Sequence, residues 1–286
     1  MAEKPPRRAP VEAERYTPEL LQCFLVDLET TSHSREVWAL LTTLGRDLGL
    51  PCVDFICASS YADFRKTLFI RTSYDSTWLN TLNADPDLHK WSYFRSHAMY
   101  HLTPIMVGLE FVDEYIHIPA RRVEVLKEAA RRGMRAGFSI PLRLHAPPQA
   151  ALITFTGDHA KREMAAIVRA HGWTMTTAAM AAHQRYMMHF SAEFPTRNHI
   201  SPKQLELLEK IGLGLQDKQI ASALGISVSA VRQRLNTLME RTGLTGRAEL
   251  AALAMSMGVL PDPLYGPGDD ASDVLIEMDG GGIHRR

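Results

Sequence analysis

One short stretch near the C-terminus constrains the fold more than any other part of the chain. A helical segment over Asp217–Leu224 is followed by Gly225, Ile226 and Ser227, and a second helical segment runs over Val228–Arg241. A glycine permits a sharp turn, the isoleucine fills the space between two helices, and a serine at that position caps the second helix. This order predicts a helix-turn-helix.

Two further helices are predicted around this pair. Ser201 is placed to cap the first, which ends at Gly214, and the last one, over Arg247–Met257, is rich in alanine and leucine. The segment from Ile200 to Gly258 is therefore predicted to be an all-α domain of four helices.

The segment Val228–Arg241 has two unlike faces. Apolar residues at helical spacing predict the buried face, which consists of Val231, Leu235, Leu238 and Met239. The opposite face carries side chains that can hydrogen bond to base edges in a major groove. These base-reading candidates are Ser229, Arg232, Gln233 and Asn236. Four basic residues on the flanks are predicted to contact phosphates; they are Lys218, Arg234, Arg241 and Arg247. The predicted partner is double-stranded DNA.

This domain resembles the C-terminal domain of LuxR-type regulators. The matching segments are Ile200–Leu208, Lys218–Ala221, Leu224–Ser227, Val231–Leu235 and Gly243–Arg247. The resemblance implies that Arg232, Gln233 and Asn236 read bases. It also implies that the chain is a homodimer, with contacts on the fourth helix around Leu250, Leu253 and Ala254. The sequence departs from the family at Gln204, where an acid is usual, and at Arg234, where histidine is common.

The preceding residues predict a mixed domain over 17–190. Val53, Phe55 and Cys57 alternate with other residues as a strand does, and Leu68–Thr72 is a candidate for the next strand. Two alternating segments around Ala146-Pro147-Pro148-Gln149 predict an antiparallel hairpin. We therefore expect an α+β sensor domain with helices packed on an antiparallel sheet.

The helices of this domain are expected from Thr17, from a cap at Ser34, over Arg121–Arg132, over His159–Ala170 and over Thr174–Phe190, with helical pieces in residues 75–107. Residues 1–16 are expected to be disordered, residues 191–199 to be a linker, and the acidic, Gly- and Pro-rich residues 259–286 to be a disordered tail.

Much of residues 20–190 resembles the autoinducer-binding domain of the quorum-sensing branch, which binds acyl-homoserine lactones. The best match is Gly133–Leu142. In one register, Trp78 is the family's lactone-binding tryptophan and Leu82 stands where its partner tyrosine is expected. In a second register, Trp91 takes that place, with Phe94 for the tyrosine. The sequence leaves both registers open.

The family's aspartate, which accepts the ligand amide N–H, has no clear equivalent. Asp85 comes too soon after Trp78, and Thr103 has the better surroundings but lacks the carboxylate. Gly137 and Thr156 complete the ligand-contact candidates. Loss of a charge-assisted acceptor weakens a buried interaction by about 1.5–3 kcal/mol. We therefore expect a non-standard small apolar ligand or none, and the alternatives are a ligand-independent regulator or a dimerising antagonist of another family member.

Composition and motifs argue against other classes of protein. The 32 basic and 32 acidic residues balance, so DNA binding requires positive charge focused on one face. The sequence lacks a metalloprotease, nucleophile-elbow, phosphate-loop or dinucleotide motif, so we expect no enzyme and no cofactor. His97 and His101 form a helical pair without a third ligand, and no metal is expected. Three cysteines and the absence of any run of about 18 apolar residues predict a cytoplasmic protein without a membrane span.

Overall fold

The computed structural model describes residues 17–58, 67–79, 97–98, 101–115, 118–142, 150–256, 275–278 and 282–285. The chain divides into two compact units, Met1–His189 and Phe190–Arg286. Each unit has its own core.

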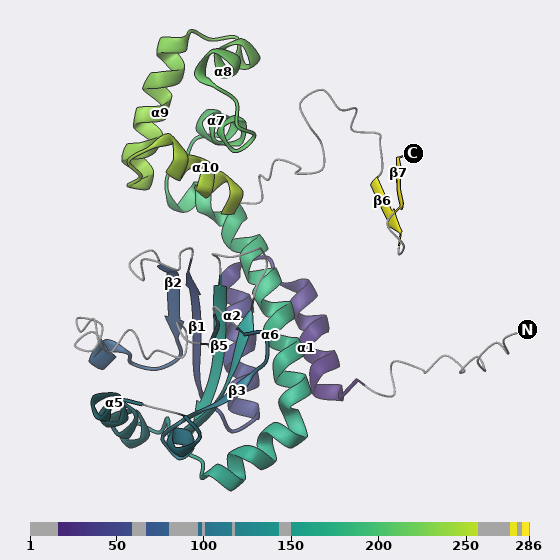
Figure 1. Ribbon diagram of the computed structural model, residues 1–286, viewed down its shortest axis with the longest axis vertical. Coiled ribbons are helices and arrows are strands. Elements are labelled where there is room, and N and C mark those ends of the chain that lie inside the picture. The colour runs from purple at the N-terminus through teal and green to yellow at the C-terminus, as the bar shows by residue number, and fades with distance from the viewer. Residues whose placement is uncertain are drawn as a thin grey trace, which may run out of the picture. The chain divides into compact units, whose positions relative to one another are not determined.

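The first unit is built on a five-stranded antiparallel sheet (Figure 1). Its strands are β1 (Cys52–Ala58), β2 (Thr67–Thr72), β3 (Ile105–Gly108), β4 (Ala136–Leu142) and β5 (Ala150–Gly157), in the spatial order β2-β1-β5-β4-β3. The predicted hairpin is confirmed, with Leu142 opposite Ala151. The α+β class is confirmed too, although residues 105–107, which we expected to be part of a helical region, form β3.

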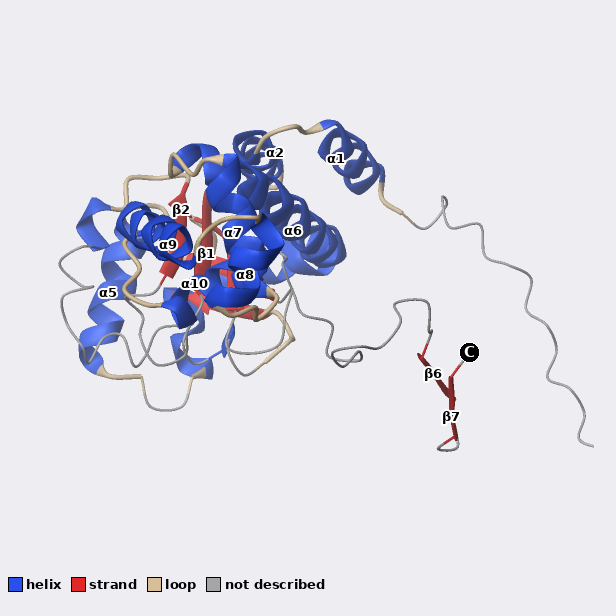
Figure 2. Ribbon diagram, turned by 90° about the horizontal axis from the view of Figure 1, so that it is seen from above, coloured by secondary structure: helices blue, strands red, loops and turns tan. Residues whose placement is uncertain are grey.

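Helices lie on both sides of this sheet. α1 (Glu19–Thr30), α2 (Ser34–Asp47) and α6 (Lys161–Arg197) lie on one side, and α5 (Ala120–Arg131) lies on the other (Figures 1 and 2). Two 3-10 helices, η3 (Thr77–Leu79) and η5 (Leu109–Glu114), follow β2 and β3. Gly133 ends α5 with a positive φ of 83°, as a glycine stop requires.

The side chains of β1 alternate between the two sides of the sheet. Phe55 contacts α6, with its ring centroid 5.0 Å from that of Tyr186 in an edge-to-face arrangement. A Cβ on Gly45 of α2 would lie 2.8 Å from Val53 Cγ2, so this glycine allows the helix to lie directly on the strand. Because strand side chains alternate, Asp54 faces away from α2 and α6, as do Cys52 and Ile56 two positions to either side of it.

α6 is a single helix of 37 residues. We predicted two helices and a linker over 191–199, and the structure corrects this prediction because the helix continues through Gly172 and on to Arg197. Its last turns are stabilised by an ion pair between Glu193 and Arg197 and by Phe194, which packs on the core of the second unit. Pro195 costs the helix one backbone hydrogen bond, which these contacts offset.

The cap of α2 also differs from the prediction. His33, and not Ser34, is the N-cap residue, and its Nδ1 accepts a hydrogen bond from the Arg35 N–H. Glu36 reaches back to the backbone N–H groups of Ser32 and His33 at 2.6 and 3.2 Å. These bonds lower the pKa of the Glu36 carboxyl, the bond from Ser32 contributing most. Histidine is not among the usual capping residues, which is why the sequence pointed to Ser34.

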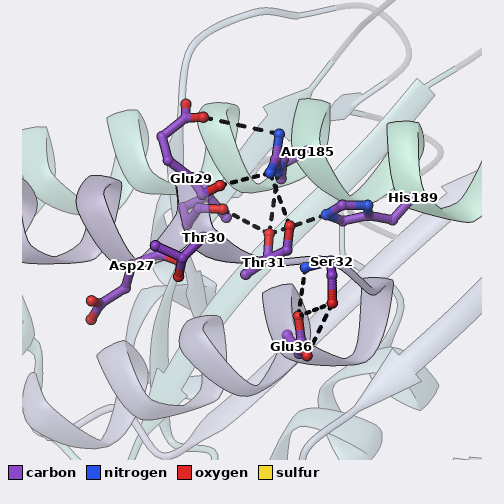
Figure 3. Close-up of polar contacts among 9 residues, drawn as sticks. Asp27, Glu29, Thr30, Thr31, Ser32, Glu36, Arg185 and His189 are labelled. Atoms are coloured by element: carbon purple, nitrogen blue, oxygen red, sulfur yellow. Dashed lines mark hydrogen bonds and ion pairs between the residues drawn. The ribbon is translucent and has the colours of Figure 1, made fainter.

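The turn between α1 and α2 is fastened to α6 (Figure 3). Arg185 donates from Nη2 to the backbone oxygens of Glu29 and Thr31 at 2.8 and 2.9 Å, and from Nε to the Thr31 hydroxyl. The same hydroxyl lies 3.1 Å from Nε2 of His189. The Thr30 and Thr31 hydroxyls donate to the carbonyls of Asp27 and Leu28 at 2.8 and 2.7 Å, so these two side chains and Arg185 satisfy the carbonyl groups at the C-terminus of α1.

The second unit contains the four predicted helices, α7 (Pro202–Gly212), α8 (Asp217–Leu224), α9 (Val228–Thr242) and α10 (Arg247–Ser256). Gly225 ends α8 in the left-handed conformation with φ 62°, and the Ser227 hydroxyl accepts a hydrogen bond from the Ala230 N–H at 3.2 Å. At the start of α7, Gln204 accepts from the Ser201 N–H at 2.9 Å. The turn and both caps therefore follow the prediction.

The core of this unit draws on all four helices. Its fully buried members include Leu207 and Leu208 of α7, Ile220 of α8 and Leu238 of α9. A separate hairpin of β6 (Leu275–Met278) and β7 (Gly282–Arg285) lies within the tail for which the sequence predicted no ordered structure.

Candidate functional site

The two faces of α9 are as unlike in the structure as they are in the sequence. Val231, Leu235 and Leu238 are buried in the core of the second unit, and Met239 packs against it. The four base-reading candidates on the other side are all exposed; they are Ser229, Arg232, Gln233 and Asn236. This arrangement gives α9 a polar, solvent-facing surface about two turns long.

Within this surface, two side chains already have contacts. The Ser229 hydroxyl lies 2.9 Å from the hydroxyl of the capping Ser227. Arg232 is 72% exposed, and its Nε lies 3.6 Å from a carboxylate oxygen of Asp217 at the start of α8. An exposed pair at this distance contributes little to stability, so the guanidinium can leave Asp217 for a stronger acceptor.

The four phosphate candidates divide into two pairs. Lys218 is exposed in the first turn of α8 and Arg234 is half-buried on α9. Arg241, by contrast, donates to the His199 carbonyl and, at 2.9 Å, to Gln204 Oε1. The buried amide of Gln204, which stands where the family usually has an acid, thus accepts from Arg241 as well as from Ser201.

Arg247 links two helices and the turn that follows α7. Its Nη1 lies 2.6 Å from Asp217 of α8, and its Nη2 donates to the Leu215 carbonyl in the turn after α7. Because Arg247 begins α10, this one side chain links the last helix to the entrance of the helix-turn-helix. Its contacts are those of a structural residue.

The three predicted dimer contacts on α10 are buried to different extents. Leu250 and Ala254 are fully buried in the core of their own domain, and Leu253 packs partly against that core. The side chains of Leu250 and Ala254 are therefore not exposed for contact with a second chain. Among the α10 side chains that the structure describes, those of Ala248, Ala252 and Met255 are exposed.

The ligand-contact candidates of the first unit that the structure describes are Trp78, Thr103, Gly137 and Thr156. Trp78 is half-buried in η3, and the Arg132 guanidinium lies 5.2 Å from the centre of its ring. Thr103 is exposed. Leu82, Trp91 and Phe94 lie outside the described residues, so the choice between the two registers stays open.

Gly137 and Thr156 lie opposite each other on β4 and β5. A Cβ on Gly137 would lie 2.3 Å from Thr156 Cγ2 and 2.8 Å from the Phe155 carbonyl oxygen. Thr156 is buried, and its hydroxyl donates to the Cys52 carbonyl at 2.9 Å. The glycine is therefore required by the close approach of β5.

The sequence did not indicate a carboxylate that lies on the same side of the sheet as Gly137 and Thr156. Asp54 of β1 accepts a hydrogen bond from the Tyr74 hydroxyl, twenty residues further along the chain. Removal from water raises the pKa of Asp54 to about 6, and the bond from Tyr74 opposes that rise. The only signal in the sequence was alternation, since Val53, Phe55 and Cys57 on one face leave Asp54 on the other.

No group of three His, Cys, Asp or Glu side chains among the described residues is placed to hold a metal ion. His97 and His101 stack with their ring centroids 4.8 Å apart. None of the described helices is long and apolar enough to span a bilayer.

Comparisons with known proteins agree with this architecture. Residues 33–186 match the autoinducer binding domain family, and residues 198–254 match the family of bacterial regulatory proteins called luxR. Transcriptional regulatory protein YdfI of Bacillus subtilis (strain 168) is 34% identical over 61 residues, which are 21% of this chain and 29% of YdfI. The chain thus spans under a third of the length of this curated relative.

Among solved structures, SdiA in complex with octanoyl-rac-glycerol aligns over 88% of this chain and 99% of its own, at 13% identity and a TM-score of 0.52. CepR2 from Burkholderia cenocepacia, an N-acylhomoserine lactone dependent LuxR family factor by its title, covers 60% of this chain and 96% of its own at 13% identity, with a TM-score of 0.47. The first likeness supports the fold.

A mixed α+β domain followed by a four-helix helix-turn-helix defines a class of DNA-binding transcription regulators, and not a class of enzymes. The chain belongs to the LuxR family of bacterial regulatory proteins, in the group that carries an autoinducer-binding domain.

Proposed function

We propose that the chain binds an inverted-repeat DNA site as a homodimer and that a small, largely apolar molecule in the first unit regulates this binding. The observation that carries the DNA-binding part is the exposed polar face of α9, opposite a fully buried stripe on the same helix. Such a face fits a major groove, and two-fold protein symmetry fits a palindromic site. A DNA partner also favours the cytoplasm.

Within this proposal, Ser229, Arg232, Gln233 and Asn236 read bases, and Lys218 and Arg234 contact phosphates. Arg241 and Arg247 already serve contacts inside their own domain, so we propose that they support the fold first and contact phosphate with the N–H groups that remain. Arg232 exchanges Asp217 for a guanine edge when DNA binds.

Two exposed apolar surfaces support the homodimer. On α6, Trp173, Met180 and Met188 are 67, 59 and 56% exposed and fall on one side of the helix. On α10, Met255 is exposed beside Ala252. Exposed apolar stripes of this kind are typical of protein–protein contacts.

Met180→Glu and Met255→Glu should each weaken the dimer, which analytical ultracentrifugation measures; a monomeric wild-type protein would contradict the proposal.

The DNA-binding part is tested by selecting sites from a random duplex library and then measuring affinity by fluorescence anisotropy. Arg232→Ala should cost about 1–3 kcal/mol and relax the preference at one base pair, whereas Lys218→Ala should weaken all sequences alike. Lys203→Ala on α7 removes the same charge outside α8 and α9 and serves as the matched control. Equal losses for Arg232→Ala on every sequence would contradict its assigned role.

The ligand part is tested by the melting temperature of the full chain with and without candidate molecules. A molecule that binds the folded state alone must stabilise it, by about 2.7 kcal/mol at a hundred times its Kd. An acyl-homoserine lactone is the first candidate because the family is named for autoinducer binding, and an acylglycerol is the second. A protein that binds DNA fully and responds to neither would be a ligand-independent regulator.

A further inference from the structure

The sheet of the first unit carries a row of polar side chains across four strands, on the face turned away from α2 and α6. The register places Thr72 of β2 opposite Asp54 of β1, Asp54 opposite Thr154 of β5, and Thr154 opposite Ser139 of β4. Directly opposed residues of antiparallel strands point to the same side with their Cβ atoms about 5 Å apart. The four side chains therefore form one continuous polar row.

The row next to it is apolar. Ile70, Ile56, Leu152 and Pro141 follow one another across the same four strands. Leu152 and Pro141 are buried, and Ile56 is half-buried. A polar row bordered by an apolar one is the lining expected for a mostly apolar molecule with a single polar group.

The hydroxyl groups of the row already have partners. Ser139 and Thr154 are buried, and their hydroxyl oxygens lie 2.7 Å apart. The Thr72 hydroxyl donates to the Tyr74 carbonyl oxygen at 2.9 Å and to the Ser76 hydroxyl at 3.2 Å. These hydroxyl contacts leave Asp54 as the member of the row with the greatest capacity to accept.

Asp54 uses one of its two carboxylate oxygens. Oδ1 accepts from the Tyr74 hydroxyl, and Oδ2 receives no hydrogen bond from any described residue. A carboxylate accepts through both oxygens, and Asp54 is only half-buried, so Oδ2 keeps the capacity to accept from a donor that enters beside it. Burial also raises the pKa of this carboxyl, against the opposing effect of the bond from Tyr74. A raised pKa beside an open acceptor is typical of a functional site.

We propose that Asp54 is the specificity-determining acceptor of the ligand site, and that it binds the N–H or O–H donor of a small, otherwise apolar molecule lying along the adjacent apolar row. Tyr74 is a positioning residue, because its hydroxyl fixes one carboxylate oxygen and leaves the other for the ligand. The inference rests on the proposed function, since it names the group that the regulated site recognises.

The experiment measures binding to the full chain by isothermal titration calorimetry, without DNA, so that a failure in DNA binding does not affect it. The probes are N-decanoyl-homoserine lactone, which offers an amide N–H, octanoylglycerol, which offers hydroxyl groups, and methyl decanoate, which offers no donor. The variants are Asp54→Leu, Asp54→Asn and Tyr74→Phe. The control is Asp158→Asn, which changes an exposed aspartate just beyond β5.

A donor-bearing probe should lose about ten- to a hundred-fold in affinity with Asp54→Leu, because a charge-assisted bond is lost, and Asp158→Asn should have no effect. Methyl decanoate should bind the Asp54→Leu variant at least as well as the wild type. Asp54→Asn keeps the shape of the side chain and the hydrogen bond from Tyr74. If this folded variant also binds the donor-bearing probes more weakly, unfolding cannot be the cause of the lower affinity. Tyr74→Phe should cause a smaller loss. The probe whose affinity falls shows whether the site recognises an amide donor or a hydroxyl donor.

Equal affinity of the donor-bearing probes for the wild type and Asp54→Leu would overturn the role of Asp54 and leave the proposed function intact. Equal losses for all three probes would overturn it too, since the effect would then be structural. If no donor-bearing probe binds the wild-type chain, both the inference and the ligand part of the proposed function fail for these classes.

Discussion

The two units differ in how far along the chain their stabilising contacts reach. In the second unit, Ser227 caps a helix through a bond to Ala230, and Gly225 forms its turn without a distant partner. In the first unit, β1 pairs with β5, and the Thr156 hydroxyl bonds to the carbonyl of Cys52, 104 residues earlier. Local contacts leave a pattern in the sequence, and distant ones leave much less.

The largest effect is expected where the distant contacts are tightest. Gly137→Ala places a Cβ against the Phe155 carbonyl oxygen and the Thr156 methyl group, both closer than 3 Å. We expect a loss of about 3 kcal/mol in the free energy of unfolding of the first unit, because neither strand can move away without breaking the sheet. Urea denaturation followed by circular dichroism measures it. Gly246→Ala, where a Cβ meets no atom within 4 Å, is the steric control in the second unit; because Gly246 directly precedes α10, we expect a loss of at most about 1 kcal/mol.

The next largest effect is expected for Arg247, whose partners lie 30 and 32 residues earlier in the chain. Its substitution tests whether the second unit also depends on a contact between residues distant in sequence. Arg247→Ala removes the bonds to Asp217 and to the Leu215 carbonyl, and we expect a loss of about 2 kcal/mol in the stability of the four-helix domain. Arg247→Lys keeps the charge but cannot bind both acceptors in the same geometry, so it should recover less than half of that loss. A thermal melt in which Arg247→Ala matches the wild type would show that local contacts suffice here.

A third prediction concerns the dependence of stability on pH. The pKa of Asp54 is about 6 in the folded chain and about 4 when the chain unfolds, so the folded state binds the proton more tightly. The stability of the first unit should therefore rise as the pH falls from about 6 to 4, and the carboxylate should lower it above pH 6. Asp54→Asn should stabilise the chain by about 1–2 kcal/mol at pH 7.5, with a smaller gain at pH 5.

Differential scanning calorimetry at the two pH values checks this, with Asp158→Asn as the exposed control. A gain for Asp54→Asn that is the same at both pH values would mean that the carboxylate does not titrate in this range.

The smallest effects compare one cap from each unit. Ser227→Ala removes the acceptor for the Ala230 N–H and should cost about 1 kcal/mol. His33→Ala removes the acceptor for the Arg35 N–H but leaves Glu36 bound to Ser32, so we expect about 0.5 kcal/mol. The two variants should each shift the chemical denaturation midpoint of their own unit alone; a change in the other unit would show that the two are coupled.

The sequence predicted the four-helix domain almost completely because each of its turns depends on a glycine or a cap within a few residues. It predicted the β4–β5 hairpin from alternating segments on either side of Pro147-Pro148. It missed the continuity of α6, because Pro195 is a strong local signal against a helix and the contacts of Phe194 and Glu193 that outweigh it are not visible in a pattern.

The candidate sites follow the same division. The exposed face of α9 is visible from helical periodicity alone. Leu250 and Ala254 were expected at a dimer contact, but periodicity cannot tell an inward apolar stripe from an outward one. Thr103 lacks the carboxylate that the family motif has at this position. The pairing of β1 with β2 instead brings Asp54 and Tyr74 together, and the distance between two residues along the chain does not predict such a contact.

The alternation along β1 has an evolutionary consequence. Val53 and Phe55 hold α2 and α6, while Asp54 between them belongs to the polar row. A substitution at Asp54 or Thr154 can therefore alter what the domain senses without disturbing the packing behind the sheet. Descendants of such a gene can acquire new signals by single codon changes while inheriting an unchanged scaffold.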